Sequence, residues 1–230
     1  MLILLPPSER KSKIKELEII FENTKFEFKN EVSKIVNTLK SVEKNDLEKI
    51  YGTSKEKSIL LHQQNLNIFT GKCAPAIERY TGVVYSHLEW NKLDSKSRNY
   101  VEKHIRIFSG FFGIVPQKTL IPEYKLKMNA LSLEKFWNPV LTNKLKNEPL
   151  IIDLLPQIHR KAYEPGTNVK KIDFLHSKNG KKTSAGHLGK SVKGELIKFL
   201  AINQITNIND LESFSFDGFN WDNENFIKEI

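Results

Sequence analysis

The sequence predicts a single compact α+β domain of 230 residues in which helices wrap a central mixed sheet. Three observations support this prediction. Apolar runs typical of strands alternate with amphipathic helical segments, as in a sheet covered by helices. Hydrophobic residues make up 39% of the chain, which is enough for a sizeable core and too many for a disordered protein. No repeat, low-complexity tract or Gly/Ser-rich linker divides residues 1–230, so one domain is expected.

The first strand is expected at Leu2–Leu5. This apolar run stops at Pro6-Pro7, where proline cannot donate a hydrogen bond to a neighbouring strand. Runs of β-branched and apolar residues predict further strands at 83–85, 150–155 and 171–175. These strands are separated by helical patterns, and this interleaving is what indicates a mixed sheet.

A hairpin and three helices complete the prediction. Asn179-Gly180 allows the positive φ angles of a tight turn, so residues 171–185 should form an antiparallel ribbon. Apolar residues recur at helical spacing over 31–41, after the N-cap residue Asp94, and over 190–203. The helix after Asp94 should continue through Phe108 and end at the following glycines. The last helix should turn three lysines toward solvent: Lys190, Lys193 and Lys198.

Composition narrows the possible environments and sites. The one cysteine, Cys73, cannot form an internal disulfide or a Cys-pair zinc site, which points to the cytoplasm. The six histidines show neither an i, i+4 pair nor a His-Glu motif, so no metal and no cofactor are predicted. Five apolar residues at the N-terminus are too few for a signal peptide, and no run approaches the roughly 20 that a membrane span needs.

The net charge of +9 is unevenly distributed along the chain. Residues 1–200 carry 35 Lys/Arg against 21 Asp/Glu, whereas residues 201–230 carry one against six. A basic face of this kind attracts polyanions, and DNA is the partner we expect. The alternative is that AT-rich coding enriches the surface in lysine. The acidic end of the chain, after Asn209, is expected to cover part of the basic surface when DNA is absent.

A local pattern between residues 31 and 68 resembles a helix-hairpin-helix, a module that grips phosphates through backbone N–H groups. Gly52 takes the position of its first glycine, Ser54 replaces the second and could cap the following helix, and Lys55 begins that helix. The alternative is an ordinary helical hairpin with a lysine-rich exposed face. Both interpretations are open at this level.

Further blocks follow one another in a specific order. They are His104-x-Arg-x-x-Ser-Gly-x-x-Gly, Ile121-Pro-Glu-Tyr-Lys-Leu-Lys-Met, Lys135-Phe-Trp, Leu141-Thr-Asn-Lys-Leu and Lys178-Asn-Gly-Lys. Together they resemble the YaaA family of bacterial proteins over nearly the whole chain. The resemblance implies a cytoplasmic protein of the peroxide-stress response that limits iron-linked damage. It also implies a sheet wrapped by helices, and DNA binding through a basic cleft and a helix-hairpin-helix element.

The resemblance also implies site residues. The opening Pro6-Pro-Ser-Glu-Arg-Lys departs from the family's Ser-Pro-Ala-Lys, which leaves Arg10 and Lys11 as alternatives for the first cation of the cleft. The chain is also shorter around residues 155–170. Ser109 with the Gly110 backbone could donate hydrogen bonds to an oxyanion. When the cleft positions of the family are transferred to this sequence, the resemblance implies a cleft that comprises Lys11, Arg106, Ser109, Lys125, Asn143, Lys181, Lys190 and Lys193.

We expect a monomer that binds DNA through phosphates with little base specificity and is not an enzyme. The rival hypothesis is an enzyme that acts on a nucleotide or nucleobase-like molecule in the same cleft. It would use Ser109, Asn143, Lys125 and either Glu9 or Asp153 for acid–base chemistry. Effects on iron would be indirect, since the sequence offers no ligand cluster.

Overall fold

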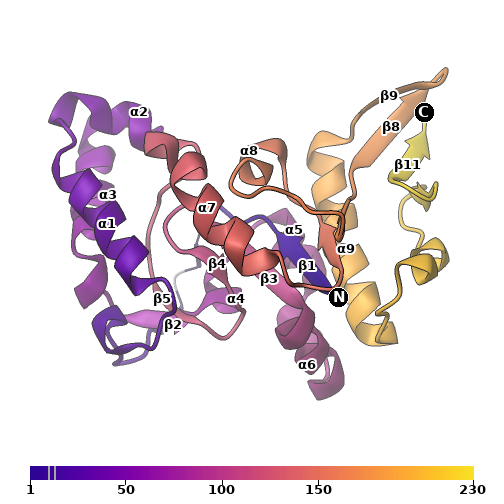
Figure 1. Cartoon of the computed structure of the whole chain (residues 1–230), viewed down its shortest axis with the longest axis horizontal. Helices are drawn as coiled ribbons and strands as arrows, with labels where there is room; N and C mark the ends of the chain where they lie inside the picture. The colour runs from indigo at the N-terminus through magenta and orange to yellow at the C-terminus, as the bar shows by residue number, and fades with distance from the viewer. Residues whose placement is uncertain (10, 13) are drawn as a thin grey trace.

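A five-stranded mixed sheet forms the centre of the computed structural model, which describes residues 1–9, 11–12 and 14–230 (Figure 1). Its strand order is β4-β3-β1-β6-β7. The four strands β3, β1, β6 and β7 are parallel, and β4 is antiparallel to β3. Its strands are β1 (Leu2–Leu5), β3 (Ile105–Ser109), β4 (Gly113–Val115), β6 (Ile151–Asp153) and β7 (Val169–Lys171).

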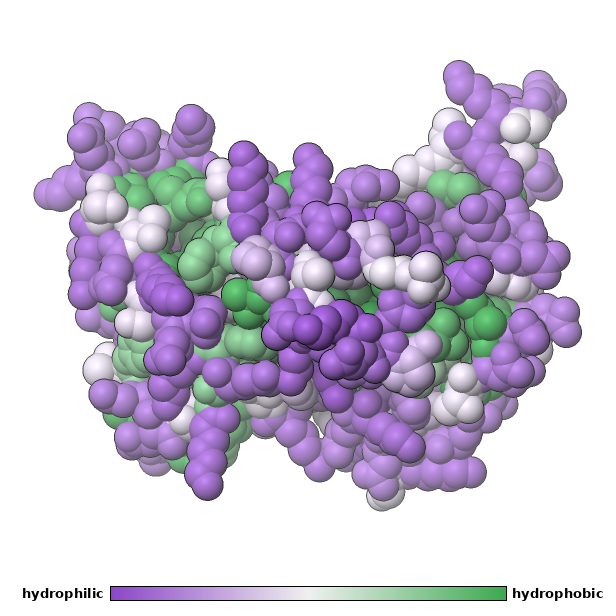
Figure 2. Space-filling view, in the orientation of Figure 1, coloured by the Kyte–Doolittle hydropathy of each residue, from purple (hydrophilic) through white to green (hydrophobic). Residues whose placement is uncertain are grey.

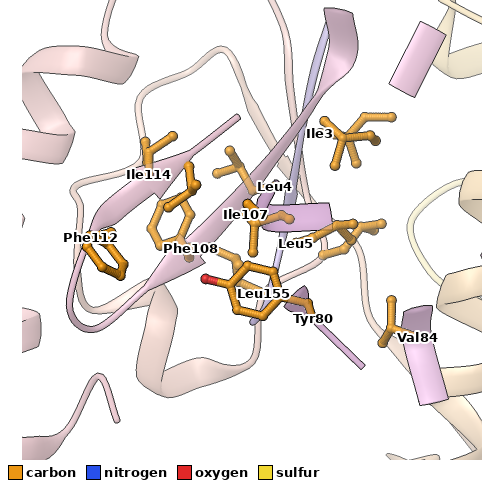
Figure 3. Packing of buried hydrophobic residues seen from close by; sticks show 14 of the residues in the cluster. Ile3, Leu4, Leu5, Tyr80, Val84, Ile107, Phe108, Phe112, Ile114 and Leu155 are labelled. Atoms are coloured by element: carbon orange, nitrogen blue, oxygen red, sulfur yellow. The ribbon is translucent and has the colours of Figure 1, made fainter. Parts of the chain in front are cut away.

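The predicted strand at Leu2–Leu5 is confirmed, and it is the middle strand of this sheet. Ile3 pairs with Ile105 on one side and with Ile152 on the other. All four residues of β1 are buried, as expected for a parallel strand covered on both faces. Figure 3 shows Leu5, Ile107 and Phe108 packed together in the core around this strand.

Two smaller sheets flank the centre. One has the order β10-β11-β8-β9, and the other pairs β2 with β5. The predicted Asn179-Gly180 turn is confirmed, because it joins β8 and β9 as an antiparallel hairpin. The strands are β2 (Cys73–Pro75), β5 (Leu120–Pro122), β8 (Phe174–Lys178), β9 (Lys181–Ser184), β10 (Asn220–Trp221) and β11 (Phe226–Glu229).

Helices cover the sheets: α7 packs on β4, α6 on β1 and β3, and α9 on α5, α6 and β8 (Figure 1). Asp94 caps α6 as predicted, since its carboxylate accepts the Ser97 N–H at 2.7 Å. The helices are α1 (Lys29–Lys40), α2 (Leu47–Tyr51), α3 (Lys55–Leu66), α4 (Ala76–Arg79), α5 (Val83–Leu88), α6 (Ser95–His104), α7 (Leu133–Leu145), α8 (Gln157–Arg160) and α9 (Gly186–Asn203).

Two predicted elements were wrong in type. Residues 83–85 form the start of helix α5 rather than a strand. Gly82 at φ +101° and Glu89 in the left-handed region bound a helix whose buried Val84, Tyr85 and Leu88 pack within the core, so packing overrides the β-branched propensity. The helix after Asp94 ends at His104, because the next residues pair with β1 as strand β3.

Two further predictions were wrong in detail. The run 171–175 is not one strand: it leaves the central sheet after β7 and enters the second sheet as β8, with Ile172 and Asp173 between them. Of the three lysines predicted on the outer face of α9, only Lys190 is exposed. Lys193 is half-buried with its ammonium group turned to the Leu154 carbonyl oxygen.

Candidate functional site

The parallel strands of the central sheet bring three polar segments to one edge. Strands β1, β3 and β6 run in the same direction, so Leu5, Ser109 and Asp153 lie at their shared carboxyl ends. Ligand sites in open α/β sheets typically lie at this edge. Two buried polar clusters occupy it, one around Lys11 and one around Asp153.

Lys11 follows β1 and is fixed beside Tyr80, with which it forms a backbone bridge. Its Nζ atom donates to the Ser8 carbonyl oxygen at 2.8 Å. The same atom lies 4.2 Å from the centre of the Tyr124 ring and 5.3 Å from that of Tyr80. The residue as a whole stays partly exposed. An amine is therefore held against two aromatic faces within reach of the surface.

Burial lowers the pKa of Lys11 to about 7, because desolvation disfavours the charged amine. The carboxylates of Glu123 and Glu9 oppose this shift, whereas Lys125 adds to it. Glu9 forms an ion pair with Lys127 at 3.2 Å. A substantial fraction of Lys11 is thus a neutral amine at physiological pH.

Three hydroxyl groups form a chain next to Lys11. The Tyr124 hydroxyl lies 2.8 Å from the Tyr80 hydroxyl and 2.7 Å from Ser109 Oγ. Ser109 Oγ accepts hydrogen bonds from the Phe111 and Phe112 N–H groups at 3.2 and 3.0 Å. Burial raises the pKa of Tyr124 to about 12, so its hydroxyl group is protonated and uncharged at neutral pH. We call Lys11, Tyr80, Tyr124 and Ser109 the lysine–tyrosine cluster.

The second cluster surrounds the fully buried Asp153. Its carboxylate accepts the Tyr163 hydroxyl at 2.6 Å and the Leu155 N–H at 2.7 Å, and it pairs with Arg160 at 3.3 Å. Arg160 also reaches Asp173 at 2.9 Å. The carboxylate is engaged by a hydroxyl, an amide and a guanidinium group, an arrangement that ties α8 to the end of β6.

Lys193 adjoins this second cluster. Burial lowers the pKa of Lys193 to about 8, and the Arg160 guanidinium adds to the shift while Asp153 and Asp173 oppose it. Its ammonium group is bound to the Leu154 carbonyl oxygen and lies 5.6 Å from the Phe174 ring centre. Lys190, also on α9, remains exposed.

The helical hairpin of α2 and α3 lies beside the lysine–tyrosine cluster in structure, though far away in sequence. Gly52 ends α2 at φ +60°, and Ser54 occupies the N-cap position of α3 without a side-chain capping bond. Inside the hairpin, Asn65 donates to the Tyr51 hydroxyl at 3.2 Å and to the Lys125 carbonyl oxygen at 2.9 Å. The hairpin is therefore tied to the segment that carries Tyr124.

The remaining predicted positions are dispersed. Arg106 donates to the carbonyl oxygens of Glu102 and Ile105, so its guanidinium group is bound at the C-terminal end of α6. Gly110 is buried, and its carbonyl oxygen accepts the Trp137 indole N–H at 2.9 Å. Of the alternatives for the first cleft cation, Arg10 lies outside the described residues. Four candidates are exposed on four separate elements, α3, α7, β9 and α9: Lys55, Asn143, Lys181 and Lys190.

The residues of the enzyme hypothesis do not form one group. Ser109 belongs to the lysine–tyrosine cluster, and Asp153 to the second cluster. Glu9 pairs with Lys127, and Asn143 lies exposed on α7. Sequence reasoning missed Tyr80, Tyr124 and Tyr163, although Tyr124 stands next to Lys125 in one of the family blocks. A single tyrosine carries no spacing signal, and only the fold brings these hydroxyls together.

The comparisons with known proteins decide the family. The family model described as "Peroxide stress protein YaaA" matches residues 1–225. The chain belongs to the YaaA family. The family resemblance predicted from the sequence blocks is thereby confirmed. A UPF0246 protein of Francisella tularensis subsp. mediasiatica is 27% identical over 249 residues, covering 100% of this chain and 97% of the relative. A UPF0246 protein of Streptococcus gordonii is 26% identical over 205 residues, covering 85% and 84%.

Membership of a YaaA peroxide-stress family raises the question of thiol chemistry, because reactive thiols reduce peroxides as thiolates. Cys73 lies on β2 and is fully buried. Burial raises the pKa of its thiol to about 11, although the Arg79 guanidinium opposes the shift. Cys73 is thus a core residue of this YaaA protein and is poorly suited to react with peroxide.

The described residues include neither a cluster of metal-binding side chains nor a membrane-spanning helix. Within residues 1–9, 11–12 and 14–230, no three His, Cys, Asp or Glu side chains are grouped so that they could hold a metal ion. In the same part of the YaaA chain, no helix is long and apolar enough to cross a membrane.

Proposed function

We propose that this YaaA protein binds DNA through phosphates, with little base specificity, and thereby limits iron-linked damage during peroxide stress. The observation that supports this proposal is the placement of the exposed lysines. The α2–α3 hairpin and the tip of the β8–β9 hairpin project at two ends of the same edge of the molecule (Figure 1). The outline between them dips, and hydrophilic side chains cover both projections (Figure 2).

The β8–β9 tip carries a concentration of positive charge. Lys178, Lys181 and Lys182 flank the Asn179-Gly180 turn, and all three are exposed. Lys182 pairs with Asp222 at 2.9 Å, while Lys178 and Lys181 have no ion pair within the described part of the chain. Lysines on a projecting two-stranded ribbon can neutralise phosphates without reading bases.

The α2–α3 hairpin offers a second type of phosphate contact. Lys55 and Lys57 are exposed in the first turn of α3, a helix of 12 residues. Because Ser54 makes no side-chain capping bond, the first N–H groups of α3 are available to a phosphate oxygen. This is the way in which a helix-hairpin-helix element would grip a backbone. Our proposal therefore includes α2 and α3 as a helix-hairpin-helix element.

Fluorescence anisotropy with a duplex oligonucleotide across a salt series tests the proposal. The Lys55→Ala, Lys181→Ala double variant should bind more weakly, and the slope of log affinity against log salt should flatten by about 1.8, or 0.9 for each lost contact. Lys96→Ala, Lys103→Ala is the matched control. It removes the same charge from exposed positions of α6, which projects from the opposite edge. A salt-independent affinity, or an equal loss in the control, would contradict phosphate binding at this edge.

A further inference from the structure

Lys11 has the surroundings of a reactive amine. Its Nζ atom donates a hydrogen bond to a neutral carbonyl oxygen, that of Ser8, and lies over the Tyr80 and Tyr124 rings. Within the described part of the chain, no carboxylate lies within 4 Å of Nζ, since the nearby Glu9 pairs with Lys127 instead. A lysine desolvated against aromatic surfaces loses its proton readily and becomes a nucleophile.

The second buried lysine provides a comparison within the same molecule. Lys193 is also bound to a carbonyl oxygen, and the carboxylates of Asp153 and Asp173 favour its charged form, as those of Glu123 and Glu9 do for Lys11. Its ammonium group lies over the ring of Phe174, which has no hydroxyl group, whereas the rings beside Lys11 are tyrosines. Of these two desolvated lysines, Lys11 is therefore the one with tyrosine hydroxyl groups nearby to act as acids and bases.

The hydroxyls beside Lys11 fit the needs of a condensation reaction. Attack of an amine on an aldehyde gives a carbinolamine, which must gain a proton on its hydroxyl group before water can leave. Tyr124 and Tyr80 keep their protons at neutral pH because burial raises the pKa of both. Their 2.8 Å contact, extended by Ser109 at 2.7 Å, forms a path along which protons can be exchanged.

We propose that Lys11 is a nucleophilic lysine that condenses with aldehydes, and that its substrate class is the ring-opened 2-deoxyribose of abasic sites in DNA. This choice of substrate rests on the proposed DNA binding, because the abasic sugar is an aldehyde presented on a phosphate backbone. The Nζ lone pair attacks C1′, a C–N bond forms, and one amine proton moves to the C1′ oxygen to give the carbinolamine. A second proton reaches this oxygen from the tyrosine hydroxyls, the C1′–O bond breaks, and water leaves. The product is an iminium ion that links protein and DNA.

Trapping with cyanoborohydride tests the inference, because hydride converts the iminium to a stable secondary amine. The native protein is mixed with a duplex that contains one abasic site, and the covalent product is digested and mapped by mass spectrometry. The adduct is expected on Lys11, and Lys11→Arg, which keeps a cation, should lower the yield at least about tenfold. Lys96→Arg, an exposed position on α6, should leave the yield unchanged.

Two control measurements separate this inference from the proposed function. Binding to an intact duplex reports DNA affinity alone: normal binding without an adduct, or an adduct spread over many lysines, would overturn the role of Lys11. If intact DNA does not bind, 2-deoxyribose 5-phosphate serves as a free aldehyde probe, and selective trapping at Lys11 would still support the nucleophile. Peptide mapping uses the unmodified chain, so the result does not depend on whether the Lys11 variant folds.

Discussion

The Nζ atom of Lys11 lies 4.2 Å from the centre of the Tyr124 ring. These residues are 113 positions apart and come from different parts of the fold, the first following β1 and the second following β5. Their contact makes Lys11 unusual among the lysines of a basic chain, because burial lowers its pKa to about 7 while most others are spread over the exposed surface.

The free energy of unfolding should therefore depend on the protonation of Lys11. Its pKa is about 7 in the folded chain and near 10.5 in the unfolded chain, so the unfolded chain binds more protons between these values. Stability should rise with pH across this window. Lys11→Met removes this contribution. The excess rise of the native chain over the variant between pH 6.5 and 10 should be about 1–3 kcal/mol, measured by urea unfolding. Lys96→Met, at an exposed position, should follow the native profile; an equal response of both variants would count against a buried amine.

Gly113→Ala should be strongly destabilising. Gly113 has φ +68°, and an added Cβ would lie 2.7 Å from Cζ3 of Trp137, a fully buried side chain of α7. We expect a loss of about 3–5 kcal/mol in urea unfolding, from backbone strain and overpacking together. Gly180→Ala is the matched control, since Gly180 has φ +78° but open space around it, and it should cost about 1–2 kcal/mol. Similar losses at both positions would mean that the Trp137 side chain can move away from the added methyl group without a loss of stability.

Cys73 should be unreactive in the folded protein. With a pKa of about 11, roughly 0.1% of its thiol is ionised at pH 8. Reaction with a disulfide reagent should be at least about 100-fold slower than in the urea-unfolded chain, and hydrogen peroxide should leave the thiol titre unchanged. Cys73→Ala should bind DNA as the native chain does. Rapid oxidation of Cys73 in the native state would instead indicate a thiol-based response.

The acidic end of the chain contacts the basic β8–β9 hairpin through the ion pair of Lys182 and Asp222. Asp222→Asn should release Lys182 and tighten duplex binding about two- to fivefold at low salt, with a steeper salt slope. Asp210→Asn makes the same change of charge at an exposed position without an ion pair in the described part of the chain, and should have a smaller effect. Equal effects would show that net charge alone is responsible.

Point substitution is a better test of this contact than truncation before Asn209. The segment after Asn209 includes β11, which pairs with β8, and the fully buried Phe219 and Phe226. Removing it would expose a strand edge and part of the core, so a change in DNA binding would not report on charge. The predicted acidic segment is thus also a structural element of the second sheet.

The prediction from sequence succeeded where local chemistry is decisive. The run Leu2–Leu5 before two prolines, the Asp94 N-cap and the Asn179-Gly180 turn all depend on neighbours in the chain, and the structure confirms each of them. The strand predicted at 83–85 was wrong, because these residues form a helix that is stabilised by packing against α9 rather than by local propensity. The predicted end of α6 was wrong for a similar reason, since residues 105–109 pair with β1 and form a strand.

The sequence by itself determined the family, the composition of the core and the surplus of positive charge, because these are sums or ordered patterns over the chain. Only the tertiary structure decided which lysines are exposed and which are held against carbonyl oxygens and aromatic rings. Lys181 and Lys11 are alike in sequence terms, yet one lies on an exposed turn and the other against Tyr124. Burial and the identity of neighbouring groups set the protonation of a lysine, and both are properties of the folded chain.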